Sequence, residues 1–341
     1  MTLVAGSYEK YIWGFRIKGP PDQGPGSEAH VLKPLFSFPS HLSPIKSLAL
    51  SSPLAASGAA SDDAVKIYDL SSLSVIGSLT DHNGAVTSLS FFTPPSLSFP
   101  RNLLTASDDG TVCIYDVDPF VCLKTVVAHK KGVNDLAVHP SGKLGLTVGR
   151  DACLAMLNLV RGKRSFCCRL GREASIVRFD DGGERFYMGT EENVSVHDSE
   201  DARLLLELEN QKRVLCVVPG ENGLLFTGGE DRNITAWDTR TGKVAYCIED
   251  AHSTRVKGLV VLGSRSSSDE DAELPYLVAS ASSDGVIRVW DVRVAKKEKP
   301  NPLTEAKTKS RLTCLAGSSV KSFKRPVAGG KEEAVIAQED S

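Results

Sequence analysis

The chain has 341 residues, of which 41% are hydrophobic and 24% are charged, and its formal net charge is −2 at pH 7. This composition is ordinary for a soluble globular protein, and the small net charge provides no overall field that would favour nucleic acid or a membrane surface. No apolar run approaches the roughly 20 residues of a membrane span. The N-terminal residues lack the basic start of a signal peptide, so we expect an intracellular protein.

The N-terminal part of the chain predicts three strands without a fourth. Residues 3–17 predict two strands around a turn at 7–10, and residues 31–38 predict an outer strand after a Pro/Gly loop. These strands resemble the later part of a four-stranded unit, and no first strand precedes them.

From residue 45 onward the chain repeats one pattern, which is clearest at residues 279–291. A strand ends, Asp284-Gly285 forms a tight turn, and a second strand closes at Asp291. The same spacing of seven residues occurs in six copies, which are Asp62/Asp69, Asp109/Asp116, Asp151/Asn158, Glu191/Asp198, Asp231/Asp238 and Asp284/Asp291. A period of roughly 40–45 residues with Trp-Asp endings is typical of a WD-repeat β-propeller.

The last strand-like segment supplies what the N-terminus lacks. Residues 311–316 predict the first strand of a unit that nothing afterwards completes. Joining this strand to the N-terminal strands closes a ring and leaves no open sheet edge between the termini. We therefore predict an all-β, seven-bladed propeller over residues 1–318 with a composite closing blade. Residues 319–341 are polar and lack periodicity, which predicts a disordered tail.

Four residues of the last full copy match the Asp–His–Ser–Trp tetrad of WD-repeat proteins, namely His252, Ser280, Asp284 and Trp290. A buried Asp needs hydrogen-bond donors, which an imidazole, a hydroxyl and an indole can supply together. A His/Ser/Asp set could also be a hydrolase triad. Similar sets recur around His82 and His129, and this recurrence favours a structural role because a catalytic site would not repeat.

The chain lacks the motifs of common catalytic and cofactor sites. It contains no Gly-rich phosphate loop, nucleophile elbow or paired metal carboxylates, and its eight Cys do not have the spacing of a zinc site. We therefore expect no enzyme activity, no metal and no cofactor.

Cations on and around the predicted third blade are candidates for partner binding. They are Lys130 and Lys131 in the loop that opens this blade, and Arg161, Lys163, Arg164, Arg169 and Arg172 around its outer strand. Such residues could contact RNA phosphates or an acidic protein. They could also form a solvated edge that protects the strand from aggregation.

Several stretches are more specific than the general repeat. They are Leu-Val-Ala-Gly-Ser-Tyr-Glu-Lys (3–10), His-Pro-Ser-Gly-Lys-Leu (139–144), Asn-Leu-Val-Arg-Gly-Lys-Arg-Ser-Phe (158–166), Ser-Ala-Ser-Ser-Asp-Gly (280–285) and Arg-Leu-Thr-Cys-Leu (311–315). In these stretches the chain resembles the p21-activated protein kinase-interacting protein 1-like family. Animal members carry a long Lys-rich tail, whereas this chain ends in Lys-Glu-Glu-Ala-Val-Ile-Ala-Gln-Glu-Asp-Ser.

The resemblance implies a factor of the nucleus and nucleolus that acts in assembly of the large (60S) ribosomal subunit and maturation of rRNA. The implied partners are proteins of the pre-60S particle and rRNA, bound by a monomer within a larger complex. In animals the resemblance also implies a negative regulator of p21-activated kinases.

A different class of function remains open. Trp237-Asp238-Thr239-Arg240 and Trp290-Asp291-Val292-Arg293 fit the Trp-Asp-x-Arg box of cullin-RING ubiquitin ligase substrate receptors. The Arg in each stretch could instead simply finish a strand.

Overall fold

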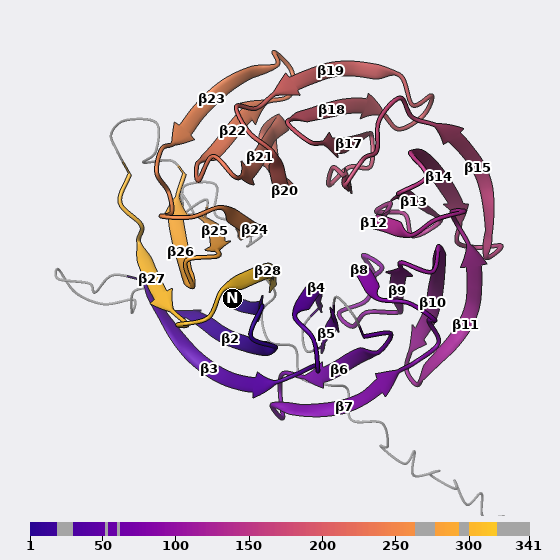
Figure 1. Ribbon diagram of the computed structural model, residues 1–341, viewed down its shortest axis with the longest axis horizontal. Helices are drawn as coiled ribbons and strands as arrows, with labels where there is room; N and C mark the ends of the chain where they lie inside the picture. Colours follow the sequence, from indigo (N-terminus) through magenta and orange to yellow (C-terminus); the bar gives the residue numbers. More distant parts are fainter. Residues whose placement is uncertain (19–29, 52–53, 60–61, 263–276, 293–299, 319–341) are drawn as a thin grey trace, which may run out of the picture.

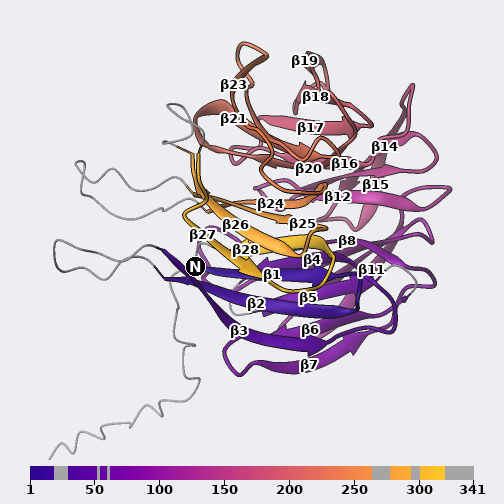
Figure 2. The ribbon, with the colours of Figure 1, turned by 60° about the vertical axis from the view of Figure 1, so that its left-hand side comes forward.

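The computed structural model describes residues 1–18, 30–51, 54–59, 62–262, 277–292 and 300–318. Within these residues the chain forms seven four-stranded sheets, and in each sheet neighbouring strands are antiparallel. The sheets stand as blades around a central axis (Figure 1), and a turned view shows them stacked around the ring (Figure 2). The predicted seven-bladed propeller is confirmed. The predicted tail at 319–341 lies outside the described residues.

The blades follow one another in chain order. The first three complete blades are β4–β7 (Ile45–Ser51, Leu54–Ala59, Val65–Asp69, Ser74–Leu79), β8–β11 (Val86–Phe92, Asn102–Ser107, Thr111–Val117, Phe120–Val127) and β12–β15 (Val133–Val138, Leu144–Gly149, Cys153–Asn158, Lys163–Arg169). The next three are β16–β19 (Ile176–Phe179, Arg185–Thr190, Asn193–Asp198, Leu204–Glu209), β20–β23 (Val214–Pro219, Leu224–Gly229, Ile234–Asp238, Lys243–Ile248) and β24–β27 (Val256–Leu262, Leu277–Ser282, Val286–Asp291, Thr304–Lys307). A short 3₁₀ turn, η1 (Glu221–Gly223), precedes β21.

Each blade begins at the central axis and ends at the outer wall, and burial follows this order. The second strands are buried at almost every position, as in β9 and β25, because both of their faces pack against neighbouring blades. The outer strands β7 and β15 are exposed along nearly their whole length. The core therefore lies between the blades, in seven apolar clusters among the described residues.

Two of the tight turns between second and third strands contain an Asp-Gly pair, at Asp109-Gly110 and at the predicted Asp284-Gly285. Gly110 and Gly285 have φ angles of +84° and +80°, a region that disfavours residues with a Cβ atom. At Gly285 a Cβ would also lie 2.8 Å from the carbonyl oxygen of Ser310. The turn Asp holds this conformation, because Asp284 Oδ1 accepts a hydrogen bond of 2.9 Å from the N–H of Val286.

The seventh blade is made from both ends of the chain. Its strands are β28 (Leu312–Ser318), β1 (Thr2–Ser7), β2 (Tyr11–Lys18) and β3 (Val31–Pro39), in the order β28-β1-β2-β3. The N-terminus lies beside β28 at the inner side of the ring (Figure 1). The Thr313 hydroxyl of β28 also donates to the carbonyl oxygen of Ile45 at 2.6 Å, which ties the composite blade to the first complete blade.

A buried carboxylate connects three inner strands on the other side of the ring. Asp135 of β12 is 6% exposed. Its Oδ1 accepts from the Ser88 hydroxyl of β8 at 2.7 Å, and its Oδ2 accepts from the Val177 N–H of β16 at 3.0 Å. The Arg178 guanidinium also pairs with Oδ2. These bonds satisfy the buried charge and fix the spacing of three consecutive blades.

Truncation tests the closure of the ring. Deleting residues 310–341 removes β28 together with its buried Leu312, and it leaves β1 without its inner partner. Loss of one large buried side chain destabilises by about 1.5–3 kcal/mol, and each lost ladder hydrogen bond adds about 1 kcal/mol. We expect a large fall in melting temperature, because total stabilities are only about 5–15 kcal/mol.

The matched truncation removes residues 319–341 alone, which leaves every described contact in place. We expect its melting temperature to stay close to that of the full chain. Equal and small shifts for the two truncations would contradict closure through β28.

Candidate functional site

The four predicted tetrad residues of the sixth complete blade form one hydrogen-bond network. His252 lies in the loop before β24, and its Nδ1 donates to Asp284 Oδ2 at 3.2 Å. Its Nε2 is 2.8 Å from the Ser280 hydroxyl, and Trp290 Nε1 donates to the same hydroxyl at 2.9 Å. The network joins the loop, the second strand and the third strand of one blade.

Incomplete versions of this network occur in other blades. In the third complete blade His129 contacts Asp151 and Thr147, each at 2.9 Å, and Leu157 stands in place of the Trp. In the second, His82 Nε2 is 2.6 Å from the Thr105 hydroxyl. The repetition around the ring supports a structural role for all of these residues.

Sequence reasoning missed two members of the series. His41 of the first complete blade contacts Asp62 at 2.8 Å and Ser57 at 2.9 Å. Ser57 stands five residues before the turn Asp instead of four, which obscures the pattern. In the fifth, Asn210 replaces His and accepts from the Thr227 hydroxyl at 2.9 Å. The separation of His41 from Asp62, which nearly equals that of His129 from Asp151, is the signal that could have revealed it.

The tetrad geometry does not suit hydrolysis. Ser280 is 0% exposed, and its hydroxyl is already engaged by an imidazole and an indole. A serine nucleophile must reach a substrate carbonyl, which a fully enclosed hydroxyl cannot do. In the described residues no group of three or more His, Cys, Asp or Glu side chains could hold a metal ion, and no helix there is long and apolar enough to cross a membrane.

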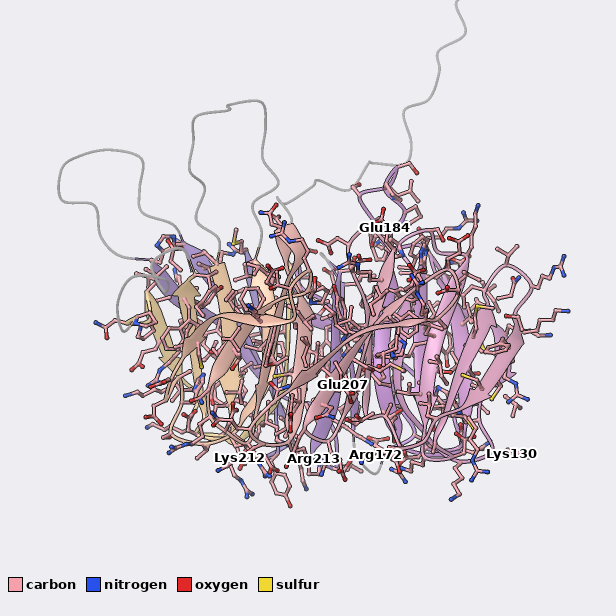
Figure 3. The ribbon with its side chains drawn as sticks, turned by 90° about the horizontal axis from the view of Figure 1, so that it is seen from above. Lys130, Arg172, Glu184, Glu207, Lys212 and Arg213 are labelled. Atoms are coloured by element: carbon pink, nitrogen blue, oxygen red, sulfur yellow. The ribbon has the colours of Figure 1, made fainter. Side chains whose placement is uncertain are left out.

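The propeller has two different faces. The loops that lead from each outer strand into the next inner strand, together with the Asp turns, form the face that carries the tetrads, which we call the tetrad face. Lys130, Arg172, Lys212 and Arg213 lie along this edge of the ring, and Glu184 lies along the opposite edge (Figure 3). Glu207 lies on the outer wall between them.

The structure separates the basic residues that the sequence groups together. Arg161 and Lys163 lie at the β14–β15 turn, on the face opposite the tetrads, whereas Arg169 pairs with Cys153 at the other end of β15. Because a strand of seven extended residues is roughly 20 Å long, the two ends of β15 lie on different faces of the propeller. Lys130, Lys131 and Arg172 belong to the tetrad face. Arg164 uses its guanidinium to donate to the Ala128 carbonyl at 2.8 Å, so part of its charge is engaged internally.

A longer series of cations runs along the tetrad face, in four consecutive loops that each enter a new blade. Its members, which we call the basic arc, are Lys130, Lys131, Arg172, Lys212, Arg213 and Arg255. All six are exposed, and in the described part of the chain no ion pair involves them. Sequence reasoning missed the last three because they are far from residue 130. All three stand just before an inner strand, and an alignment of the repeats with one another would have revealed this shared position.

The central channel holds a cavity of about 730 Å³. The second halves of the inner strands line it with apolar residues such as Leu50, Val138 and Val261, while Arg178, Asp180 and Asp181 contribute charges. These residues lie toward the face opposite the tetrads.

Comparison with known proteins identifies the family. The WD domain, G-beta repeat model matches residues 73–116, 120–156 and 246–291. A p21-activated protein kinase-interacting protein 1-like protein of Xenopus laevis is 31% identical over 317 residues, covering 93% of this chain and 81% of that protein. This chain belongs to the p21-activated protein kinase-interacting protein 1-like family.

Two further relatives extend the comparison. The human p21-activated protein kinase-interacting protein 1 is 31% identical over 345 residues, covering 100% of this chain and 83% of that protein. Shk1 kinase-binding protein 15 of Schizosaccharomyces pombe is 26% identical over 294 residues, covering 85% and 77%. The predicted family resemblance is confirmed. WD-repeat propellers are typically non-catalytic scaffolds.

One of the two Trp-Asp-x-Arg stretches has its Arg among the described residues. Arg240 folds back on its own turn, because its Nε donates to Asp238 Oδ1 at 3.2 Å. Its side chain remains largely exposed. Arg293 lies outside the described residues.

Two of the buried imidazoles, His41 and His82, make the stability of the ring depend on pH. Burial lowers the pKa of the His82 imidazole, although Asp109 acts to raise it, and burial lowers the pKa of His41 despite Asp62. The unfolded chain protonates these side chains near pH 6.5. Because the folded pKa values are lower, stability is full above about pH 6.5 and is lost as the pH falls toward the folded values.

Replacing one buried imidazole tests this dependence. We expect His82→Asn to reduce the fall in melting temperature between about pH 6.5 and pH 5, because Asn does not titrate there. Asn210 shows that this side chain can serve the same position. At pH 7.5 the variant should lose only about 1 kcal/mol of stability. Melting curves of both proteins that keep identical pH slopes would contradict the interpretation.

Proposed function

We propose that this family member is a non-catalytic docking scaffold that acts in assembly of the large ribosomal subunit and maturation of its rRNA, in the nucleus and nucleolus. The observation that carries the proposal is the basic arc, which presents six exposed cations from four consecutive loops. Cations held at fixed positions attract and orient anionic partners, so these loops are suited to bind proteins or RNA of a precursor particle.

The family resemblance supplies the biological setting, and the fold supplies the mechanism. Loops on a rigid scaffold are the usual place for binding residues, and this ring holds its loops at fixed spacing through tetrads and the Asp135 bridge. In this view the protein contributes a rigid surface and changes little in shape when it binds.

Depletion with rescue tests the proposal. We expect loss of the protein to lower large subunits relative to small subunits and to cause accumulation of large-subunit rRNA precursors. The wild-type chain should restore both, whereas the variant Lys130→Glu/Arg172→Glu/Lys212→Glu should not. These side chains are exposed and form no ion pair in the described part of the chain. Even an exposed ion pair contributes only about 0–1 kcal/mol, so the variant should melt near the wild-type temperature.

The matched control is Arg161→Glu/Lys163→Glu, which reverses two charges at the opposite face. We expect this variant to rescue. Normal subunit ratios after depletion would count against the proposal, and rescue by the arc variant would remove the basic arc from it.

A second candidate function is binding and negative regulation of a p21-activated kinase. The human and fission-yeast relatives are named as kinase-interacting and kinase-binding proteins, and a propeller is suited to protein–protein contacts. The two functions are compatible if they use different surfaces.

A purified pull-down separates the candidates. We expect the immobilised chain to capture a p21-activated kinase and to lower its activity on a peptide substrate. Absence of capture at micromolar concentration would contradict this second function. Capture of a cullin-RING ligase adaptor, lost on Arg240→Ala, would instead favour the ubiquitin-ligase alternative.

A further inference from the structure

Two arginines of the basic arc converge with a lysine at the mouth of the central channel. Arg213 directly precedes β20, and Arg255 directly precedes β24. Lys257 is the second residue of β24 and occupies a bulge in its pairing with β25. Since β20 and β24 are neighbouring inner strands, the three cations face one region of the tetrad face. We call them the channel-mouth cluster.

Acidic side chains of the described residues lie near the cluster, but none forms an ion pair with it. Lys257 is half-buried, and burial lowers the pKa of its ammonium group, with Arg255 and Arg213 lowering it further against Cys216 and Glu230. In the described part of the chain none of the three cations forms an ion pair within 4.0 Å. A partly desolvated cation beside two like charges is destabilised until an anion arrives.

The same strand position elsewhere in the ring shows that this arrangement is not required by the fold. Lys46 occupies the corresponding bulge of β4. Its ammonium lies 4.0 Å from Asp108, and Asp108 pairs with Arg150 at 2.9 Å. The lysine on the first-blade side of the channel mouth therefore has a carboxylate within 4.0 Å, whereas Lys257 on the side at β20 and β24 has no such partner among the described residues.

We infer that the channel-mouth cluster binds an acidic segment of a partner protein, with Asp or Glu carboxylates placed between Arg213, Arg255 and Lys257. Guanidinium groups suit carboxylates because their paired N–H donors match the two carboxylate oxygens. The inference goes beyond the proposed role in subunit assembly, since it assigns the chemistry of a contact and holds whatever the partner's pathway.

Neighbouring charges favour a peptide over RNA. Glu191, Glu192, Glu230 and Glu249 are exposed in turns and loops of the tetrad face. Two of them adjoin Arg213, because the Glu191 carbonyl accepts from the Val214 N–H at 2.7 Å and the Glu230 N–H donates to the Arg213 carbonyl at 3.0 Å. A continuous polyanion would have to lie against these carboxylates, whereas single acidic side chains can reach the cluster between them. Asp180 and Asp181 line the channel cavity farther along the axis. Their negative charges repel an acidic segment, so the segment should bind at the mouth and not enter the channel.

A direct binding measurement tests the inference. The probe is a fluorescein-labelled peptide of alternating Asp and Gly residues, titrated with the purified full chain and followed by anisotropy. We expect saturable binding that Arg213→Gln, Arg255→Gln and Lys257→Gln each weaken about tenfold, the size of one charge-assisted hydrogen bond. The matched control Lys46→Gln should stay within about twofold. A peptide with Asn in place of Asp should not bind.

Three results would overturn the inference. They are absence of binding to the wild-type chain, unchanged affinity in all three cluster variants, and tighter cluster-dependent binding of an oligouridylate of equal charge, which would assign the site to RNA. Arg213 and Arg255 are exposed loop residues, so their variants should fold normally, as melting curves will verify. The assay uses a synthetic peptide and purified protein, so it tests the inference alone. The proposed role in subunit assembly would fail in a different experiment, through normal subunit ratios after depletion.

Discussion

No blade of this propeller can cover its own two faces, and the structure depends on the contact that closes the circle. Leu3 and Ala5 of β1 pack with Leu277 of β25 in one cluster, while β28 pairs with β1 along six positions. If this contact is absent, the inner edge of β1 is unpaired and apolar faces of two blades meet water. The tetrads and the Asp135 bridge fix the loops and the spacing of the blades, but they can do so only in a ring that is already closed.

Much of the fold follows from the sequence because its determinants are local. The turn Asp, the seven-residue spacing to the closing residue and the apolar strands lie within one repeat, so they predict each blade independently. The composite blade is predictable for a similar reason, since 311–316 lacks the rest of a blade and 3–17 lacks its beginning. The missed His41 shows the limit of this approach: one extra residue between Ser57 and Asp62 hides the pattern, although the side chains still meet.

The binding surface is less predictable, because it depends on how distant repeats are placed relative to one another. Arg161 and Arg172 are near neighbours in the chain, yet β15 carries the residues around them to opposite faces. Lys130 and Arg213 are far apart in the chain, yet Figure 3 shows them along one edge. A search made in the repeat frame, which compares the residue before each inner strand, finds Arg213 and Arg255 as equivalent positions. Whether a lysine of an inner strand has a carboxylate beside it, as Lys46 has Asp108, depends on contacts between blades.

The split of one blade between the two chain ends also sets a timetable for biosynthesis. About 300 residues separate β1 from β28, and at a synthesis rate of roughly 5–20 residues per second the second strand follows the first by roughly 15–60 s. During this interval the newly made β1 has no inner neighbour, and its free edge is available to any other extended chain. A nascent propeller of this kind is therefore a natural client for a chaperone that shields strand edges until synthesis ends.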